Sequence, residues 1–227
     1  MPPLLRTLCF LPALLATARA EDIGRQFAGY PPPYIEMVRA AMQSFTARDF
    51  ETAIKQVDKA DLLFQVTPVA LNIRGAIAIE QKKYDEGRDF CLQALKADPN
   101  FYPARFNLCE IPFVQGKYKE ARALLRNLLE SFPKDDLVKF RIYLTFLLEK
   151  DDDAAQQHRD HVPFLSDSPV YYYTQAAWEF AHGNPTAAKG WLTRGNEVFP
   201  PVRHQNYIDV FYDLRWLERP GTPKSGE

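Results

Sequence analysis

The chain has 227 residues, of which 46% are apolar, and its formal net charge is −1. This apolar content supports a continuous core and excludes a largely disordered chain. Acidic and basic residues are interleaved without a basic stripe, which argues against a nucleic-acid binder and against a polybasic membrane anchor.

The first 20 residues have the pattern of a secretory signal peptide. Arg6 precedes a largely apolar run at 7–16, and Ala18 and Ala20 form a small-residue cleavage pattern before Glu21. The alternative is a retained membrane helix, but the apolar run falls well short of the ~20 residues that span a bilayer. We therefore expect an exported protein, periplasmic or extracellular, with no membrane span once the signal is removed.

Residues 21–33 include three consecutive prolines and are expected to form an extended leader. An internal repeat follows, because a shift of 34 residues superimposes aromatic, small and proline positions. The aligned sets are Phe50, Tyr84 and Tyr118; Ala53, Gly87 and Ala121; and Pro99 and Pro133. A shift of 67 residues carries Gly116 to Gly183, Ala121 to Ala188 and Pro133 to Pro200.

Each repeat unit is expected to contain two helices joined by a short polar turn. In residues 68–101, apolar and small side chains recur at spacings of three and four, which places them on one face of each helix. Pro99 ends the second helix because proline disfavours helix in the residue before it. Gly75 and Gly87 leave room for the two helix axes to approach closely, so the unit predicts an antiparallel hairpin.

This pattern resembles the tetratricopeptide repeat family. The units that carry it span residues 34–67, 68–101, 102–135, 136–168 and 169–202. The fourth unit departs most, because Tyr143 stands where a small residue is expected and Arg159 occupies an apolar column. The resemblance implies an all-α, right-handed α-solenoid of about five helix pairs.

The end of the chain is expected to close the solenoid. A terminal repeat otherwise exposes an apolar side, so solenoids carry a cap. Residues 203–218 place Tyr207, Phe211 and Trp216 roughly on one face and are expected to form a capping helix. Residues 219–227 are expected to be a flexible tail.

Pro112 lies inside the expected first helix of the 102–135 unit. A proline there removes a backbone hydrogen bond and bends the helix. The bend is either a tolerated kink or a feature that opens the inner surface at Phe113.

The sequence contains no nucleophile elbow, no zinc-protease helix and no glycine-rich phosphate loop. His158 and His161 share one helix face, but a metal site would need at least a third ligand, and we interpret the pair as surface residues. We therefore expect no catalytic activity, no cofactor and no metal site.

The family resemblance implies that the first helix of each pair lines a concave groove. The groove positions expected to bind a protein or peptide are Asn72, Phe106, Glu110, Phe113, Tyr173 and Phe180. Other groove positions, including Phe140 and Leu144, are apolar as well. The alternative is that these side chains pack in the core or are covered by the C-terminal cap. The Lys and Asn pattern that clamps a terminal carboxylate in chaperone adaptors of this family is absent.

Cys91 and Cys109 remain after signal cleavage and lie on neighbouring helices of successive units. They could form a disulfide in an oxidising compartment. The alternative is two buried free thiols, with Cys109 replacing a small packing residue.

Taken together, the sequence predicts a non-catalytic, exported protein–protein interaction module or adaptor that binds a peptide or protein segment in an apolar groove. The alternative is a homo-oligomeric structural protein of the cell envelope, whose groove receives the end of a neighbouring chain.

Overall fold

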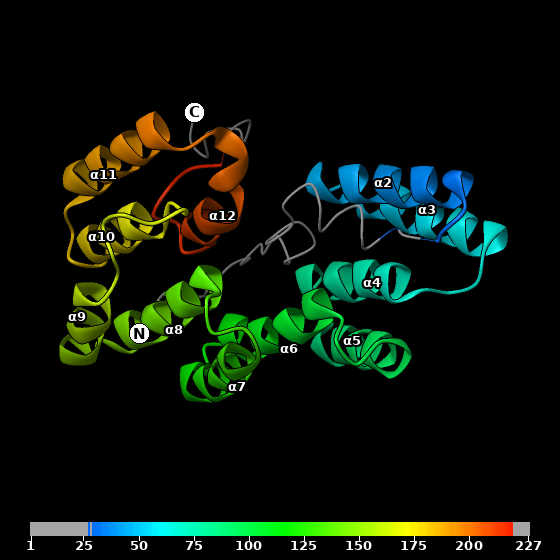
Figure 1. Ribbon diagram of the computed structural model, residues 1–227, viewed down its shortest axis with the longest axis horizontal. Coiled ribbons are helices and arrows are strands. Elements are labelled where there is room, and N and C mark those ends of the chain that lie inside the picture. Colours follow the sequence, from blue (N-terminus) through cyan, green and yellow to red (C-terminus); the bar gives the residue numbers. More distant parts are fainter. Residues whose placement is uncertain (1–26, 28, 220–227) are drawn as a thin grey trace, which may run out of the picture. The chain divides into compact units, whose positions relative to one another are not determined.

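The computed structural model describes residue 27 and residues 29–219. Within these residues the secondary structure consists of eleven α-helices and one short 3₁₀ helix, with no strand (Figure 1). This confirms the prediction of an all-α fold of helix pairs. The predicted signal peptide, most of the leader and nearly all of the tail lie outside the described residues.

The described residues form two compact units, one ending at Gln115 and the other beginning at Gly116. The boundary lies in the turn between two helices of the expected 102–135 repeat. We call the two parts the N-terminal unit and the C-terminal unit.

The N-terminal unit contains two helix hairpins and one further helix. Its helices are α2 (Pro32–Thr46), α3 (Phe50–Leu63), α4 (Pro68–Glu80), α5 (Tyr84–Ala97) and α6 (Tyr102–Val114). α2 packs on α3 and α4 packs on α5. The core between them is lined largely by small and β-branched side chains, such as Ala53, Val57 and Ile73, all fully buried. α6 contains Pro112 close to its end, so the helix continues for only two residues beyond the proline.

The C-terminal unit contains the remaining helices. They are α7 (Tyr118–Ser131), α8 (Asp136–Glu149), α9 (Asp152–Asp160), α10 (Val170–Ala181), α11 (Pro185–Val198), the 3₁₀ helix η1 (Pro201–Arg203) and α12 (Gln205–Asp213). α10 and α11 form a hairpin, and α8 packs on α7, α9 and α10. α12, which is shorter than the expected 203–218 segment, packs on α10 (Figure 1).

The turn inside each helix pair contains one residue with left-handed backbone geometry. These residues are Arg48, Lys82, Gly116, Lys150 and Gly183, with φ between 61° and 78°. They recur at the interval of the sequence repeat, so the same turn geometry is used whether or not the residue is glycine. This conformation costs a non-glycine residue about 1–2 kcal/mol. Glycine avoids this cost and occupies two of the five positions.

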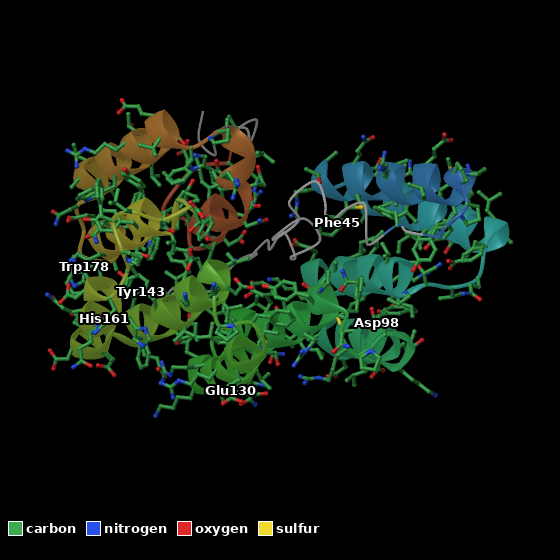
Figure 2. The ribbon with its side chains drawn as sticks, viewed as in Figure 1. Phe45, Asp98, Glu130, Tyr143, His161 and Trp178 are labelled. Carbon is green, nitrogen blue, oxygen red and sulfur yellow. The ribbon has the colours of Figure 1, made fainter. Side chains whose placement is uncertain are left out.

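The two unusual residues of the fourth repeat are accommodated by contacts with α10. Tyr143, placed where a small residue was expected, is buried, and its hydroxyl donates to the Thr174 carbonyl oxygen at 3.2 Å. The Arg159 guanidinium lies 4.2 Å from the ring centre of Trp178 on α10, a cation–π contact. Figure 2 labels Tyr143 and Trp178, together with His161 at the end of α9. α9 is therefore held partly by polar and aromatic contacts, since Ala155 is its only buried residue.

Candidate functional site

All six residues expected to line the groove are buried in the structure. The exposed fraction is between 1% and 2% for Asn72, Phe106, Glu110, Phe113 and Tyr173, and 9% for Phe180. Such side chains present almost no surface to a partner in this conformation. Partner binding through them stays a prediction, and the contacts that bury them are specific to each unit.

In the N-terminal unit, Asn72 is used inside the protein. Its side-chain oxygen accepts a hydrogen bond from the Asn107 side-chain amide at 2.9 Å, and both residues are buried. The bond joins α4 to α6 and satisfies part of a polar group that would otherwise be costly to bury. Asn107 was not singled out by sequence reasoning, because a single asparagine on a helix gives no periodic signal.

In the C-terminal unit, Tyr173 and Phe180 are covered by α12 and the turn after it. The Tyr173 ring centre lies 5.3 Å from that of Tyr207 and 5.5 Å from that of Phe211. Phe180 stacks on Trp216 at 5.6 Å. The C-terminal cap thus covers this part of the expected groove, which is the alternative that the sequence left open.

A buried histidine anchors the start of α12. His204 Nε2 lies 3.0 Å from the Phe199 carbonyl oxygen, and Nδ1 lies 3.2 Å from the Tyr173 hydroxyl. Because a carbonyl oxygen only accepts, a neutral His204 donates from Nε2 and accepts the Tyr173 hydroxyl at Nδ1. Burial raises the pKa of the Tyr173 phenol, which keeps that hydroxyl protonated.

Cys91 and Cys109 are buried free thiols in the structure. Cys91 Sγ occupies the space beside Gly75, and Cys109 Sγ donates to the Arg105 carbonyl oxygen at 3.3 Å. Burial raises the pKa of each thiol to about 12. Both are therefore packing residues here, and the disulfide stays a prediction for an oxidising compartment.

The two histidines on α9 have separate environments. The His158 ring lies 5.0 Å from the Phe146 ring, whereas His161 is exposed and its Nδ1 lies 2.6 Å from the Gln157 carbonyl oxygen. Among the residues that the structure describes, no three His, Cys, Asp or Glu side chains are grouped so that they could hold a metal ion.

A cavity of about 520 Å³ lies on the N-terminal unit between α3, α4 and α5. Its apolar lining includes Phe50, Ile77 and Phe90, and its charged lining includes Lys55 and Arg74. The Arg74 guanidinium is 2.7 Å from a carboxylate oxygen of both Asp58 and Asp61. The Arg74 guanidinium is thus paired with two carboxylates and offers no unpaired positive charge to a ligand in the cavity.

The C-terminal unit carries four strongly exposed apolar side chains on two neighbouring segments. Their exposed fractions are 58% for Phe164, 87% for Leu165, 59% for Val198 and 79% for Val202. Arg203 donates to the Asp167 carbonyl oxygen at 3.4 Å, which ties the two segments together. Sequence reasoning missed this set because its members lie at the end of α11 and in the segments between α-helices, where the repeat pattern carries no signal.

None of the described helices combines the length and the apolar character needed to cross a membrane.

Comparison with known proteins gives a family match for part of the chain. A model of the tetratricopeptide repeat family matches residues 78–139, from the end of α4 to the start of α8. No curated protein matches the chain. A solved structure of a tetratricopeptide repeat protein from Parabacteroides merdae is similar at 16% identity and a TM-score of 0.48, over 82% of this chain and 75% of that chain. A likeness this distant does not bear on function.

The family match covers most of the 68–101 unit and all of the 102–135 unit, and it extends across the turn that contains Gly116. It confirms the resemblance inferred from the aligned small, aromatic and proline positions. Residues 78–139 are thus similar to the tetratricopeptide repeat family.

Proposed function

We propose that the protein is an exported, non-catalytic adaptor that holds another protein. The observation that carries the proposal is the tetratricopeptide repeat match at residues 78–139, within a chain of tandem helix pairs. The fold suggests a protein–protein interaction module, because stacked helix pairs offer extended surfaces and no preformed reaction centre.

The chemistry of the described residues supports a non-catalytic function. The thiolate is the reactive form of cysteine, and burial raises the pKa of Cys91 and Cys109 to about 12. Both thiols therefore stay protonated and shielded at neutral pH, so neither is suited to be a nucleophile.

Export rests on the sequence of the first 20 residues, and its test is the mass of the secreted chain. We expect a mature protein that begins at Glu21, after the Ala18 and Ala20 cleavage pattern. A chain beginning at Arg19 would mean that an alternative cleavage pattern is used. Exported material that still carries Met1 would rule out a cleavable signal.

The adaptor function is tested by proximity labelling in the native host, with the labelling enzyme fused after Glu227. An adaptor should label a small, reproducible set of envelope or secreted proteins, and reciprocal capture should return this chain. The control is an unrelated exported protein with the same fusion. Identical labelling by both fusions would count against an adaptor.

A homo-oligomeric structural protein is the second candidate. It is favoured by the exposed apolar side chains of Phe164, Leu165, Val198 and Val202. Exposed apolar side chains that gather on one surface mark contact sites, and self-association would cover side chains such as these. The two candidates differ in the molar mass in solution.

A further inference from the structure

Cationic side chains gather around one ring where α7 and α9 pack on α8 (Figure 1). The centre of the Phe146 ring, on α8, lies 3.9 Å from the guanidinium carbon of Arg122 and 6.0 Å from that of Arg126, both on α7. The His158 ring of α9 lies 5.0 Å from the same ring centre. We call the surface formed by Arg126, Phe146, His158 and His161 the α7–α9 patch.

The two arginines over the Phe146 ring differ in their partners. The Arg122 guanidinium donates to the Glu149 carboxylate at 2.6 Å and to the Thr145 hydroxyl at 3.0 Å. Arg126, one turn further along α7, is exposed, and no ion pair joins it to a carboxylate of the residues that the structure describes. Arg122 thus shows an arrangement that this ring supports, a guanidinium over the ring with a carboxylate bound to it, and Arg126 has the ring without the carboxylate.

The charges that act on His158 are all positive. Burial is the main cause that lowers its pKa, and the charges of Arg126, His161 and Arg122 lower it further, in that order. The carboxylate that α8 contributes beside Arg122, that of Glu149, is already paired with that arginine. The surroundings of His158 therefore favour a negative group at the patch.

His161 extends the α7–α9 patch at the end of α9, where Figure 2 labels it. It is exposed, and its Nδ1 lies 2.6 Å from the Gln157 carbonyl oxygen. Because a carbonyl oxygen only accepts, Nδ1 donates this bond and Nε2 is the nitrogen that takes up a second proton. Arginine keeps its charge at every working pH, whereas histidine gains charge in mild acid. The positive charge of the patch therefore grows as the pH falls.

We propose that the α7–α9 patch binds carboxylates of an acidic segment in a partner protein, and that protonation of its two histidines strengthens this binding. Arg126 binds one carboxylate as Arg122 binds Glu149, and the protonated histidines attract a second. This inference rests on the proposed adaptor function and specifies the chemistry of its partner. The patch lies mainly on the second helices of two repeat units and contains none of the six expected groove residues.

Binding and protonation are linked at this site. A carboxylate near His158 favours the imidazolium form, so a bound acidic segment raises the pKa of His158. By reciprocity, a lower pH tightens the binding of that segment. Because the patch is exposed at Arg126 and His161, added salt should weaken the binding. A partner held by apolar contacts alone would show neither dependence.

The test uses the full chain without its predicted signal and the acetylated, amidated peptide Gly-Glu-Glu-Gly as the probe. NMR follows the ring resonances of the four histidines. We expect the probe to raise the pKa of His158 and to leave the titrations of His182 and His204, which lie outside the patch, unchanged. It should bind at least about threefold more tightly at pH 5.5 than at pH 7.5, which corresponds to one exposed ion pair. The neutral peptide Gly-Gln-Gln-Gly should do neither.

Substitutions separate the patch from general charge attraction. Arg126→Gln should weaken probe binding at least about threefold. The matched control is Arg194→Gln, because Arg194 is also an exposed arginine over a ring, that of Trp191 at 4.7 Å on α11. This control should leave probe binding unchanged. His158→Gln should keep the binding at pH 7.5 and remove most of its pH dependence, and circular dichroism checks that each variant keeps its helices.

Two outcomes would overturn the site itself. Equal weakening by Arg126→Gln and Arg194→Gln would show that the probe responds to net charge only. Tighter binding of inorganic phosphate than of the acidic probe, under the same conditions, would overturn the assignment to carboxylates.

The probe is synthetic, so the result does not depend on finding a partner. Probe binding without any labelled partner would leave the patch in place and overturn the adaptor function. Partners labelled equally by the unchanged chain and by Arg126→Glu would leave the adaptor function in place and overturn the patch as their binding site.

Discussion

Gly87 lies where α5 packs closely on the backbone of α4. A Cβ atom at this position would stand 2.7 Å from Ile79 Cγ1 and 3.1 Å from the Gly75 carbonyl oxygen. A Cβ atom at Gly75 would stand 3.1 Å from Cys91 Sγ. Glycine lowers helix propensity, so its presence in both helices shows that the close packing of the hairpin outweighs that cost.

Gly87→Ala is expected to destabilise the protein by about 1–3 kcal/mol, because the methyl group displaces Ile79 or separates the two helices. Gly190→Ala is the matched control. Gly190 lies within α11, and a Cβ there meets no atom within 4 Å. This control should gain up to about 1 kcal/mol from helix propensity alone. Urea unfolding followed by circular dichroism measures both, and equal effects of the two substitutions would contradict the packing argument.

The thiol pair gives a second prediction at the residue scale. Since burial raises the pKa of Cys91 and Cys109 to about 12, the folded protein should resist iodoacetamide at mildly alkaline pH. After denaturation without a reductant, both thiols should be alkylated, as peptide mapping by mass spectrometry would show. A crosslinked peptide containing both residues would instead establish the disulfide.

The lowered pKa of His158 predicts that the folded protein loses stability in mild acid. Burial is the main cause that lowers its pKa below the usual 6.5, and the positive charge of Arg126 acts in the same direction. The unfolded chain therefore takes up the proton first, so the stability present above about pH 6.5 falls as the pH drops towards the folded pKa. His158→Gln should make this decline shallower in thermal unfolding between pH 7.5 and about pH 5. An unchanged slope would assign the decline to other groups.

At the scale of elements, α9 is a short helix whose stability depends on its cap and on a few side-chain contacts. It has nine residues and buries only Ala155. Asp151 precedes it, and its carboxylate accepts a hydrogen bond from the Ala154 amide at 3.2 Å. Because apolar burial contributes little here, the cap and the Arg159 contact with Trp178 carry much of its stability.

Asp151→Ala is expected to cost about 1 kcal/mol by removing this cap. The loss should concentrate in α9, so amide hydrogen exchange of residues 154–160 should accelerate more than that of α10. Asp153→Ala serves as the control, since Asp153 is exposed in the first turn and is not the capping residue. Its effect should stay below about 0.5 kcal/mol. Equal acceleration in both variants would show that general charge at the helix start matters, rather than the cap.

α12 marks the limit of sequence reasoning at this scale. The repeat pattern predicted helix pairs because small residues, turns and prolines recur at a fixed interval, and each signal lies within about 34 residues. The contacts of Tyr207 and Phe211 with Tyr173 join segments that share no repeat relation. An aromatic side chain at a groove position gives the same sequence pattern whether it faces solvent, a partner protein or the C-terminal segment of its own chain. The fold of the repeats was therefore predictable, and the covering of Tyr173 and Phe180 was not.

At the scale of the whole molecule, the exposed apolar side chains decide between an adaptor and a self-assembling protein. A stable interface uses about 20 or more residues from each partner and buries about 800 Å² on each side. The exposed set formed by Phe164, Leu165, Val198 and Val202 is much smaller than that. Single molecules commonly expose apolar patches of moderate size.

We therefore expect the mature protein to be monomeric at low micromolar concentration and to associate weakly, if at all, at several hundred micromolar. Light scattering coupled to size-exclusion chromatography measures the molar mass across this range. Any association at high concentration should be abolished by Leu165→Asp, which places a charge in the exposed set. Leu92→Asp, at a half-exposed leucine on α5, should have no such effect. A dimer or larger assembly that persists at low micromolar concentration, and that Leu165→Asp dissociates, would instead favour the structural protein over the adaptor.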